Sequence, residues 1–104
     1  QLRTYEFLEL RTLGNPNPGA EASYLKIIGT DLQQLASELT LGAVAYFGNP
    51  YIRDALVHGY NQPPVGPDYA APAAPQYFNY RKTAIYAGSN EIQRNILSKA
   101  VLGM

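Results

Sequence analysis

The stretch from Ala20 to Phe47 constrains the fold more than any other part of the sequence. Mostly apolar residues recur there at alternating steps of three and four, namely Leu25, Ile28, Leu32, Leu35, Leu39, Gly42 and Tyr46. This spacing predicts one long helix with a narrow apolar seam. Such a helix would extend about 42 Å and cannot bury the seam against itself. Other helices or other subunits must therefore cover it, and Ile27, Leu41 and Val44 indicate a second neighbour.

Shorter helices are predicted on both sides of this one. Residues 1–13 show approximate helical spacing, and the breaker-rich run Gly14–Gly19 separates them from the long helix. We expect Asn17 to cap the long helix, with Pro18 at its first position. Residues 77–86 form a further predicted helix. Ser89 can cap a last helix over residues 90–102, in which Ile92, Ile96 and Leu97 would face the core.

The proline-rich segment between residues 51 and 76 has no clear periodicity. A short helix over 51–58 is possible, and five prolines follow between Gly59 and Gln76. Two interpretations stay open: an ordered irregular loop anchored by Tyr60 and Tyr69, or a flexible surface loop. With no convincing strand, the sequence predicts an all-α, up-and-down helical bundle of the four-helix type. We expect one domain over residues 1–104, read as a fragment or as a separately encoded C-terminal domain.

Composition excludes several classes of function. Eight basic and eight acidic residues balance, and no Lys/Arg cluster occurs, which argues against nucleic-acid binding. Cysteine is absent and His58 is the only histidine, so no metal site is predicted. No apolar run approaches the roughly 20 residues of a membrane span, and no signal peptide opens the chain. We therefore expect a cytoplasmic, bacterial protein.

The junction from Ala87 to Glu91 has the features of a helix start that can meet a ligand. The first backbone N–H groups of a helix lack intrahelical partners and can donate to an electronegative group. Gly88 has no Cβ and permits close approach. Taken alone this pattern is weak, because most helices that begin with serine cap themselves and bind nothing.

The segment from Ile85 to Gly103 reads IYAGSNEIQRNILSKAVLG. It resembles the C-terminal signature of the acyl-CoA dehydrogenases, whose usual wording is close to IYEGTSEIQRNIIAERVLG. Glu21–Lys26, which reads EASYLK, is similar to a P-E-A-S-x-x-K stretch of the same family, and Tyr80–Tyr86 also resembles it. The resemblance covers about the first half and the last quarter of the chain. The segment 49–76 does not match, and the family's glycine-rich adenine-binding segment is not recognisable.

The resemblance implies that the chain is the C-terminal helical domain of an FAD-dependent enzyme. The implied activity is α,β-dehydrogenation of an acyl-CoA thioester, with electrons passed to an electron-transfer flavoprotein. Ser89, Asn90 and Glu91 would contact FAD, Gly88 would lie beside the thioester, and Tyr86 would border the substrate pocket. The family also implies a dimer or tetramer core built from this domain, and an isolated domain without activity.

Ala87 stands where many family members carry the glutamate that removes the substrate α-proton, and a methyl group cannot accept a proton. Two hypotheses follow. The base lies on an earlier helix outside this chain, or the chain belongs to a non-catalytic partner of a heteromeric enzyme. An acyl-CoA oxidase also remains open within the enzyme class. The rival from another class is a non-enzymatic helical assembly subunit or interaction module.

Overall fold

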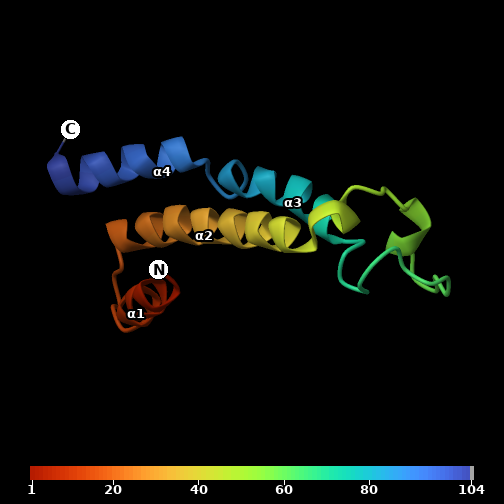
Figure 1. Cartoon of the computed structure of the whole chain (residues 1–104). Helices are drawn as coiled ribbons and strands as arrows, with labels where there is room; N and C mark the ends of the chain where they lie inside the picture. Colours follow the sequence, from red (N-terminus) through yellow and green to blue (C-terminus); the bar gives the residue numbers. More distant parts are fainter. Residues whose placement is uncertain (104) are drawn as a thin grey trace. The chain divides into compact units, whose positions relative to one another are not determined.

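The computed structural model describes residues 1–103, and its regular structure is helical throughout (Figure 1). The α-helices of the described residues are α1 (Leu2–Leu13), α2 (Ala20–Val44), α3 (Ala73–Tyr80) and α4 (Asn90–Leu97). The described residues also form three short 3-10 turns, η1 (Ala45–Gly48), η2 (Arg53–Leu56) and η3 (Arg81–Ala84), and one π-helical turn, η4 (Ser98–Leu102). No strand occurs within residues 1–103, which confirms the all-α class.

The chain divides into two compact units. The first unit contains residues 1–33 and the described residues from Lys82 onward, and the second contains residues 34–81. Helix α2 begins in the first unit and ends in the second. Each unit therefore consists of a part of α2 and the segments that pack on it.

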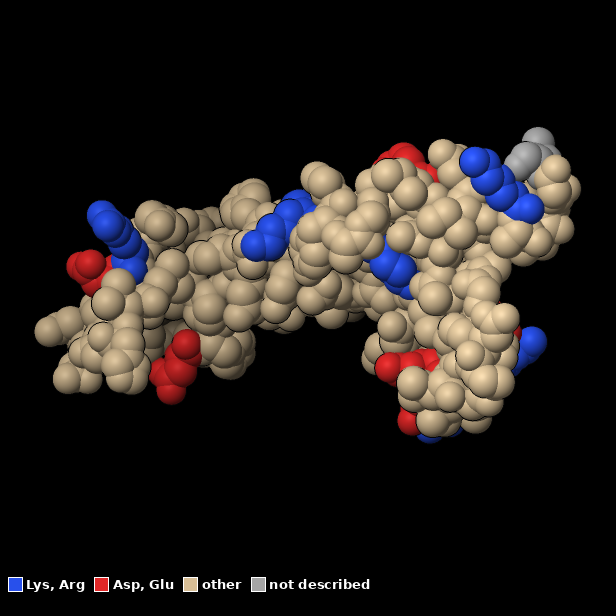
Figure 2. Space-filling view, turned by 180° about the vertical axis from the view of Figure 1, so that it is seen from behind, with Lys and Arg blue, Asp and Glu red and all other residues tan. Residues whose placement is uncertain are grey.

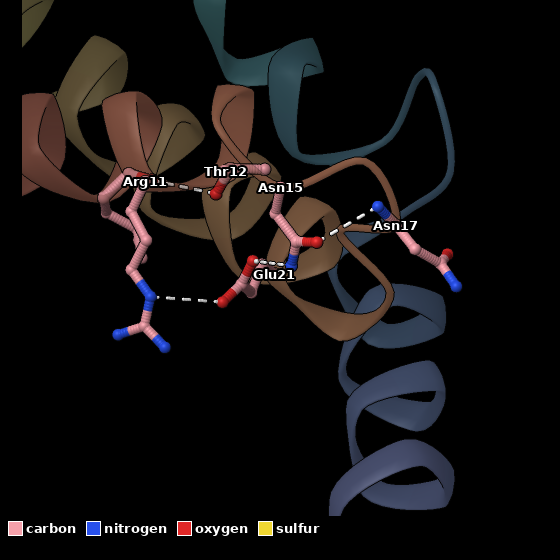
Figure 3. Close-up of polar contacts among 6 residues, drawn as sticks. Arg11, Thr12, Asn15, Asn17 and Glu21 are labelled. Carbon is pink, nitrogen blue, oxygen red and sulfur yellow. Dashed lines mark hydrogen bonds and ion pairs between the residues drawn. The ribbon is translucent and has the colours of Figure 1, made fainter.

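In the first unit, α1 approaches α2 at Gly29. A Cβ added to Gly29 would lie 2.8 Å from the Tyr5 hydroxyl, so the two helices approach closely there. Around the connection, the Glu21 carboxylate contacts Arg11 Nε at 3.4 Å and accepts a hydrogen bond from Asn15 Nδ2 at 3.2 Å (Figure 3). These polar contacts fix the corner between α1 and α2.

The predicted cap at Asn17 is wrong. Helix α2 begins at Ala20, and Gly19 precedes it with φ +51°, a left-handed conformation that glycine adopts without strain. The backbone N–H of Asn17 instead donates to Asn15 Oδ1 at 3.1 Å, so these residues form a local polar turn (Figure 3). The helix therefore starts two residues later than the Asn-Pro pattern indicated.

In the second unit, the proline-rich loop and α3 pack on the end of α2. Val44, Ala70 and Ala73 form a small buried cluster, with Leu41 packed against it. At the other end of the unit, Arg81 and α2 meet through hydrogen bonds to Gln34 and Ser37. Val44, the last residue of α2, thus packs with Ala73 at the start of α3, whereas the earlier Gln34 and Ser37 bond to Arg81 after α3. This is the antiparallel order of an up-and-down bundle.

The apolar seam predicted on α2 is not its buried face. The buried residues of α2 are Ser23, Ile27, Thr30, Ser37 and Val44. In contrast, Leu39 is 64% exposed and Tyr46 is 86% exposed. The neighbouring segments are held by hydrogen bonds to small polar side chains, which permit a closer approach than leucines do. The predicted seam lies on the other side of the helix. It is half-buried at Leu25, Ile28 and Leu32 and exposed from Leu35 onward.

The loop and the last helix also differ from the predictions in detail. Ala70, at 1% exposed, anchors the loop, while neighbouring Tyr69 is exposed. The last helix covers the predicted residues, with a π-helical final turn. Its side chains Ile92 and Ile96 remain 54% and 44% exposed, so the prediction that they face the core is wrong for these two, whereas Leu97 is half-buried.

Candidate functional site

The junction before α4 contains two consecutive residues with left-handed backbone. Ala87 has φ +56° and Gly88 has φ +82°. For an alanine this conformation costs roughly 1–2 kcal/mol, because Cβ approaches the following carbonyl oxygen. Glycine carries no such penalty. The strained residue, Ala87, is therefore the one that the sequence resemblance aligns with the family's catalytic base.

Ser89 caps α4, as the sequence predicts. Its backbone is extended, with φ −62° and ψ 156°, and its Oγ accepts the Ile92 amide at 3.4 Å. The Gln93 amide donates to the Ser89 carbonyl at 3.0 Å, which closes the first helical turn. The helix axis, and with it the positive end of the helix dipole, is thereby fixed relative to the strained junction.

Glu91 is exposed in the first turn of α4. Its pKa is lowered below the ordinary 4.5, first by a hydrogen bond from its own backbone N–H and then by one from the Ser89 hydroxyl. The positive charges of Arg94 and Lys26 lower it further. The Glu91 carboxylate is thus a negative group that the chain itself places at the helix start. A ligand oxygen would compete with it for the Glu91 backbone N–H and the Ser89 hydroxyl.

Asn90 differs from its two neighbours because its side chain is directed into the protein. It is 5% exposed, and its Oδ1 accepts a hydrogen bond from Lys26 Nζ at 2.7 Å. The part of Asn90 available to a ligand at the helix start is therefore its backbone. This arrangement joins α4 to α2.

Gly88 lies against the side chain of Gln93. A Cβ added at Gly88 would be 2.6 Å from Gln93 Nε2, so only glycine fits without moving that amide. The backbone at Gly88 therefore has a polar side-chain amide next to it. The side chains of Tyr86 and Ala87 are exposed beside it.

A separate pocket of about 350 Å³ lies in the second unit. It is lined by apolar and uncharged residues, which are Leu41, Gly48, Asn49, Pro50, Tyr51, Ala74, Pro75 and Phe78. None of the predicted site residues, 86–91, contributes to it. The pocket and the start of α4 are therefore distinct features.

Other kinds of site find no support within residues 1–103. No three His, Cys, Asp or Glu side chains of the described chain are grouped so that they could hold a metal ion. No helix of that part is long and apolar enough to cross a membrane. On the face shown in Figure 2, basic side chains stand apart from one another on a mostly uncharged surface.

Two residues that contact the predicted site were not singled out from the sequence, Lys26 and Gln93. Gln93 follows Ser89 by four residues, one helical turn, and this spacing alone places it over the junction. Lys26 lies in the EASYLK stretch, but its contact with Asn90 spans 64 positions and has no local signal. Comparisons with models of known protein families, with curated proteins and with solved structures found no match to this chain.

Proposed function

We propose that this chain is the C-terminal helical domain of an FAD-dependent acyl-CoA dehydrogenase. The observation that carries the proposal is the helix start at Gly88–Glu91, where a bare left-handed glycine precedes a serine-capped helix. The same residues carry the sequence resemblance to the family. An isolated domain would be inactive, because the proposed active site also needs parts of the enzyme outside this chain.

The residues at this helix start suit the edge of a flavin. Backbone N–H groups at the positive end of α4 can donate to electronegative flavin atoms in place of the Glu91 carboxylate. Gly88 presents backbone without a Cβ, and the side-chain amide of Gln93 lies against it. Ser89, Asn90 and Glu91 would hold the cofactor, and Tyr86 and Gly88 would border the thioester. When bound, FAD supplies the acceptor for the hydride that leaves the acyl Cβ.

The base that takes the α-proton would come from outside this chain. Ala87 presents only a methyl group, and its left-handed backbone holds that position close to the helix start. We propose that a glutamate on an earlier helix approaches the same point. The alternative proposal is a non-catalytic subunit of a heteromeric acyl-CoA dehydrogenase, which keeps the helix start for packing or for flavin binding.

Open apolar surfaces support a role in assembly. Exposed large apolar side chains occur on α1 (Leu2, Phe7, Leu10 and Leu13), on α2 (Leu35 and Leu39) and on α4 (Ile92 and Ile96). A chain that leaves these surfaces uncovered gains stability when partners bury them. We propose that they form the core of a dimer or tetramer in the bacterial cytoplasm, with an electron-transfer flavoprotein as redox partner.

The test is to express the full-length protein that carries this chain, alone and with the products of neighbouring genes. A yellow protein with flavin absorbance, bleached by an acyl-CoA under anaerobic conditions, is the expected result. Flavin bound without bleaching by acyl-CoAs of any chain length favours the non-catalytic subunit. Absence of flavin in every preparation overturns the proposal.

The position of the base has its own test. If a glutamate on an earlier helix already serves, Ala87→Glu in the full-length protein should not raise the rate of flavin bleaching. Ala87→Gln is the matched control, because it adds the same bulk without a carboxylate. A large gain with the glutamate variant alone would contradict the relocated base.

A further inference from the structure

A hydrogen bond between Lys26 and Asn90 joins α2 to the candidate site across 64 positions of the sequence. The Lys26 ammonium donates to Asn90 Oδ1 at 2.7 Å, and Asn90 is almost fully buried. Hydrogen bonds with a charged donor are shorter and stronger than those between neutral groups, and more so when water is excluded. Lys26 is half-buried, so little water competes for this bond.

Lys26 is itself held in place by its surroundings on α2. Thr30 Oγ1 donates to the Lys26 carbonyl at 2.8 Å and approaches the Thr83 carbonyl at 3.5 Å. Thr30 and Thr83 are both buried, so α2 is tied to the segment that leads into the junction. The base of the lysine side chain therefore has a fixed position relative to the start of α4.

Asn90 is the first helical residue of α4, directly after the cap Ser89 and the left-handed pair Ala87–Gly88. Backbone held in such conformations persists only where its surroundings over-determine it. The bond from Lys26 supplies one such constraint from a different helix. It also holds a positive charge beside the helix end that already carries the positive pole of the dipole.

We propose that Lys26 is a positioning residue for the cofactor-facing start of α4. It acts through Asn90 to set the direction of the first-turn amides, and its charge raises the electron affinity of the group bound there. This inference rests on the proposed flavoprotein function. The influence of the lysine charge already reaches this turn, since it is among the causes that lower the pKa of Glu91.

The experiment uses the full-length flavoprotein and three variants at Lys26. Lys26→Met removes donor and charge, Lys26→Arg keeps both, and Lys26→Gln keeps a donor without charge. Lys99→Met is the matched control, because Lys99 is an exposed lysine in η4. The measurements are the flavin dissociation constant, the flavin absorbance maximum, the midpoint potential and the melting temperature of the apoprotein.

We expect Lys26→Met to weaken flavin binding about tenfold or more, a change typical of losing one charged hydrogen bond. The midpoint potential of the flavin in Lys26→Met should become more negative than in the unmodified protein. Lys26→Arg should restore affinity and potential, whereas Lys26→Gln should restore affinity in part but not the potential. Asn90→Asp should retain flavin, because it turns the contact into an ion pair.

The outcomes separate this inference from the proposed function. If the unmodified protein binds no flavin, the proposed function fails and the inference with it. If the unmodified protein is yellow and Lys26→Met matches Lys99→Met in affinity, spectrum and potential, the positioning role is overturned. Should Lys26→Met not fold, the arginine and glutamine variants decide: equal potentials in the two overturn the electrostatic role.

Discussion

The guanidinium of Arg81 lies over the ring of Tyr77, with its Cζ 4.4 Å from the ring centroid. Nη2 of the same group donates to the Gln34 carbonyl at 2.9 Å and to Ser37 Oγ at 3.1 Å. Its Nε is buried and has no hydrogen-bond partner within the described part of the chain. Arg81 therefore fastens the end of α3 to α2 through a stacked cation and neutral oxygen acceptors.

Replacing Arg81 with alanine should lower the free energy of unfolding by about 2–3 kcal/mol. Hydrogen bonds from a charged donor contribute about 1.5–3 kcal/mol, and the stacking contact is also lost. Denaturant titration followed by circular dichroism measures the change. Lys82→Ala, the same truncation at the exposed neighbouring position, should stay within about 0.5 kcal/mol. Equal denaturant midpoints for Arg81→Ala and Lys82→Ala would show that Arg81 does not stabilise the packing of α3 on α2.

Gly66 and Gly59 form a matched pair that separates backbone strain from a steric clash. Both have positive φ, +82° and +92°, but a Cβ at Gly66 would collide with the Phe47 ring, whereas one at Gly59 meets open space. Gly59→Ala should lower the free energy of unfolding by about 1–2 kcal/mol, because alanine is strained at positive φ. Gly66→Ala should cost a further 1–3 kcal/mol or so, from overpacking.

Adding Phe47→Ala to the Gly66→Ala variant checks the cause. The ring is then gone, and the excess cost of alanine at position 66 over that at position 59 should disappear. A thermal melt of each variant suffices. An excess that survives the removal of the ring would mean that another contact holds Gly66.

Ala87 and Ala36 should respond to glycine in opposite directions. Ala87 has φ +56°, so glycine there relieves strain and should stabilise the chain by up to about 1 kcal/mol after its own entropic cost. Ala36 lies inside α2, where glycine should destabilise by about 1 kcal/mol. Melting temperatures of the two single variants give the comparison. A loss of stability in both would argue against strain at Ala87.

Glu91 should make the stability of α4 depend on pH. Its pKa is lower in the folded chain than the ordinary 4.5, because its own backbone amide and the Ser89 hydroxyl favour the carboxylate. The stabilising contribution of the Glu91 carboxylate is therefore present above pH 4.5 and is lost as the pH falls through the lower pKa that Glu91 has in the folded chain. Glu91→Gln should melt below the unmodified chain at pH 7 and approach it in acid.

The Glu91 experiment needs a control for net charge. Glu38→Gln removes the same charge at an exposed position in the middle of α2, away from any helix start. Its difference from the unmodified chain is subtracted at each pH. A Glu91 effect that is unchanged between pH 7 and strong acid would contradict the assigned hydrogen bonds.

Leu39 and Val44 test whether the open face of α2 serves assembly. Leu39 is exposed and Val44 is buried in the cluster with Ala70 and Ala73. Leu39→Lys should leave helix content unchanged and dissociate the oligomer that we propose for the full-length protein. Val44→Lys should unfold this region, because it buries an unpaired charge. Sedimentation and circular dichroism distinguish the two effects. An oligomer unaffected by Leu39→Lys would exclude this face from the interface.

Local signals predicted much of the fold. The periodicity of α2, the breaker run Gly14–Gly19 and the Ser89 cap are signals carried by neighbouring residues, and each predicted element is present. The cap predicted at Asn17 is wrong, although α2 begins at Ala20 as its periodicity predicts, and the start of α3 at Ala73 was missed. There a left-handed glycine and a proline inside the first turn of α3 set the starts, and single-residue conformations leave little trace in periodicity.

The choice of the buried face of α2 could not be predicted from hydrophobicity. Two stripes on this helix alternate in steps of three and four, one mostly apolar and one containing Ser23, Thr30 and Ser37. Thr30 and Ser37 of the second stripe find their hydrogen-bond partners, Thr83 and Arg81, far along the chain. Such partners are invisible in a local pattern, as was the contact of Lys26 with Asn90.

The proline-rich loop joins two halves of the chain that already hold one another without it. Lys26 bonds to Asn90 in the first unit, and Arg81 bonds to the Gln34 carbonyl in the second, and both bonds bridge residues on opposite sides of the loop. Residues 61–66 at its centre are exposed. A protease cut there would break the covalent chain without releasing either piece. The two fragments should therefore copurify, and separately expressed halves, divided at this loop, should reconstitute the helical domain.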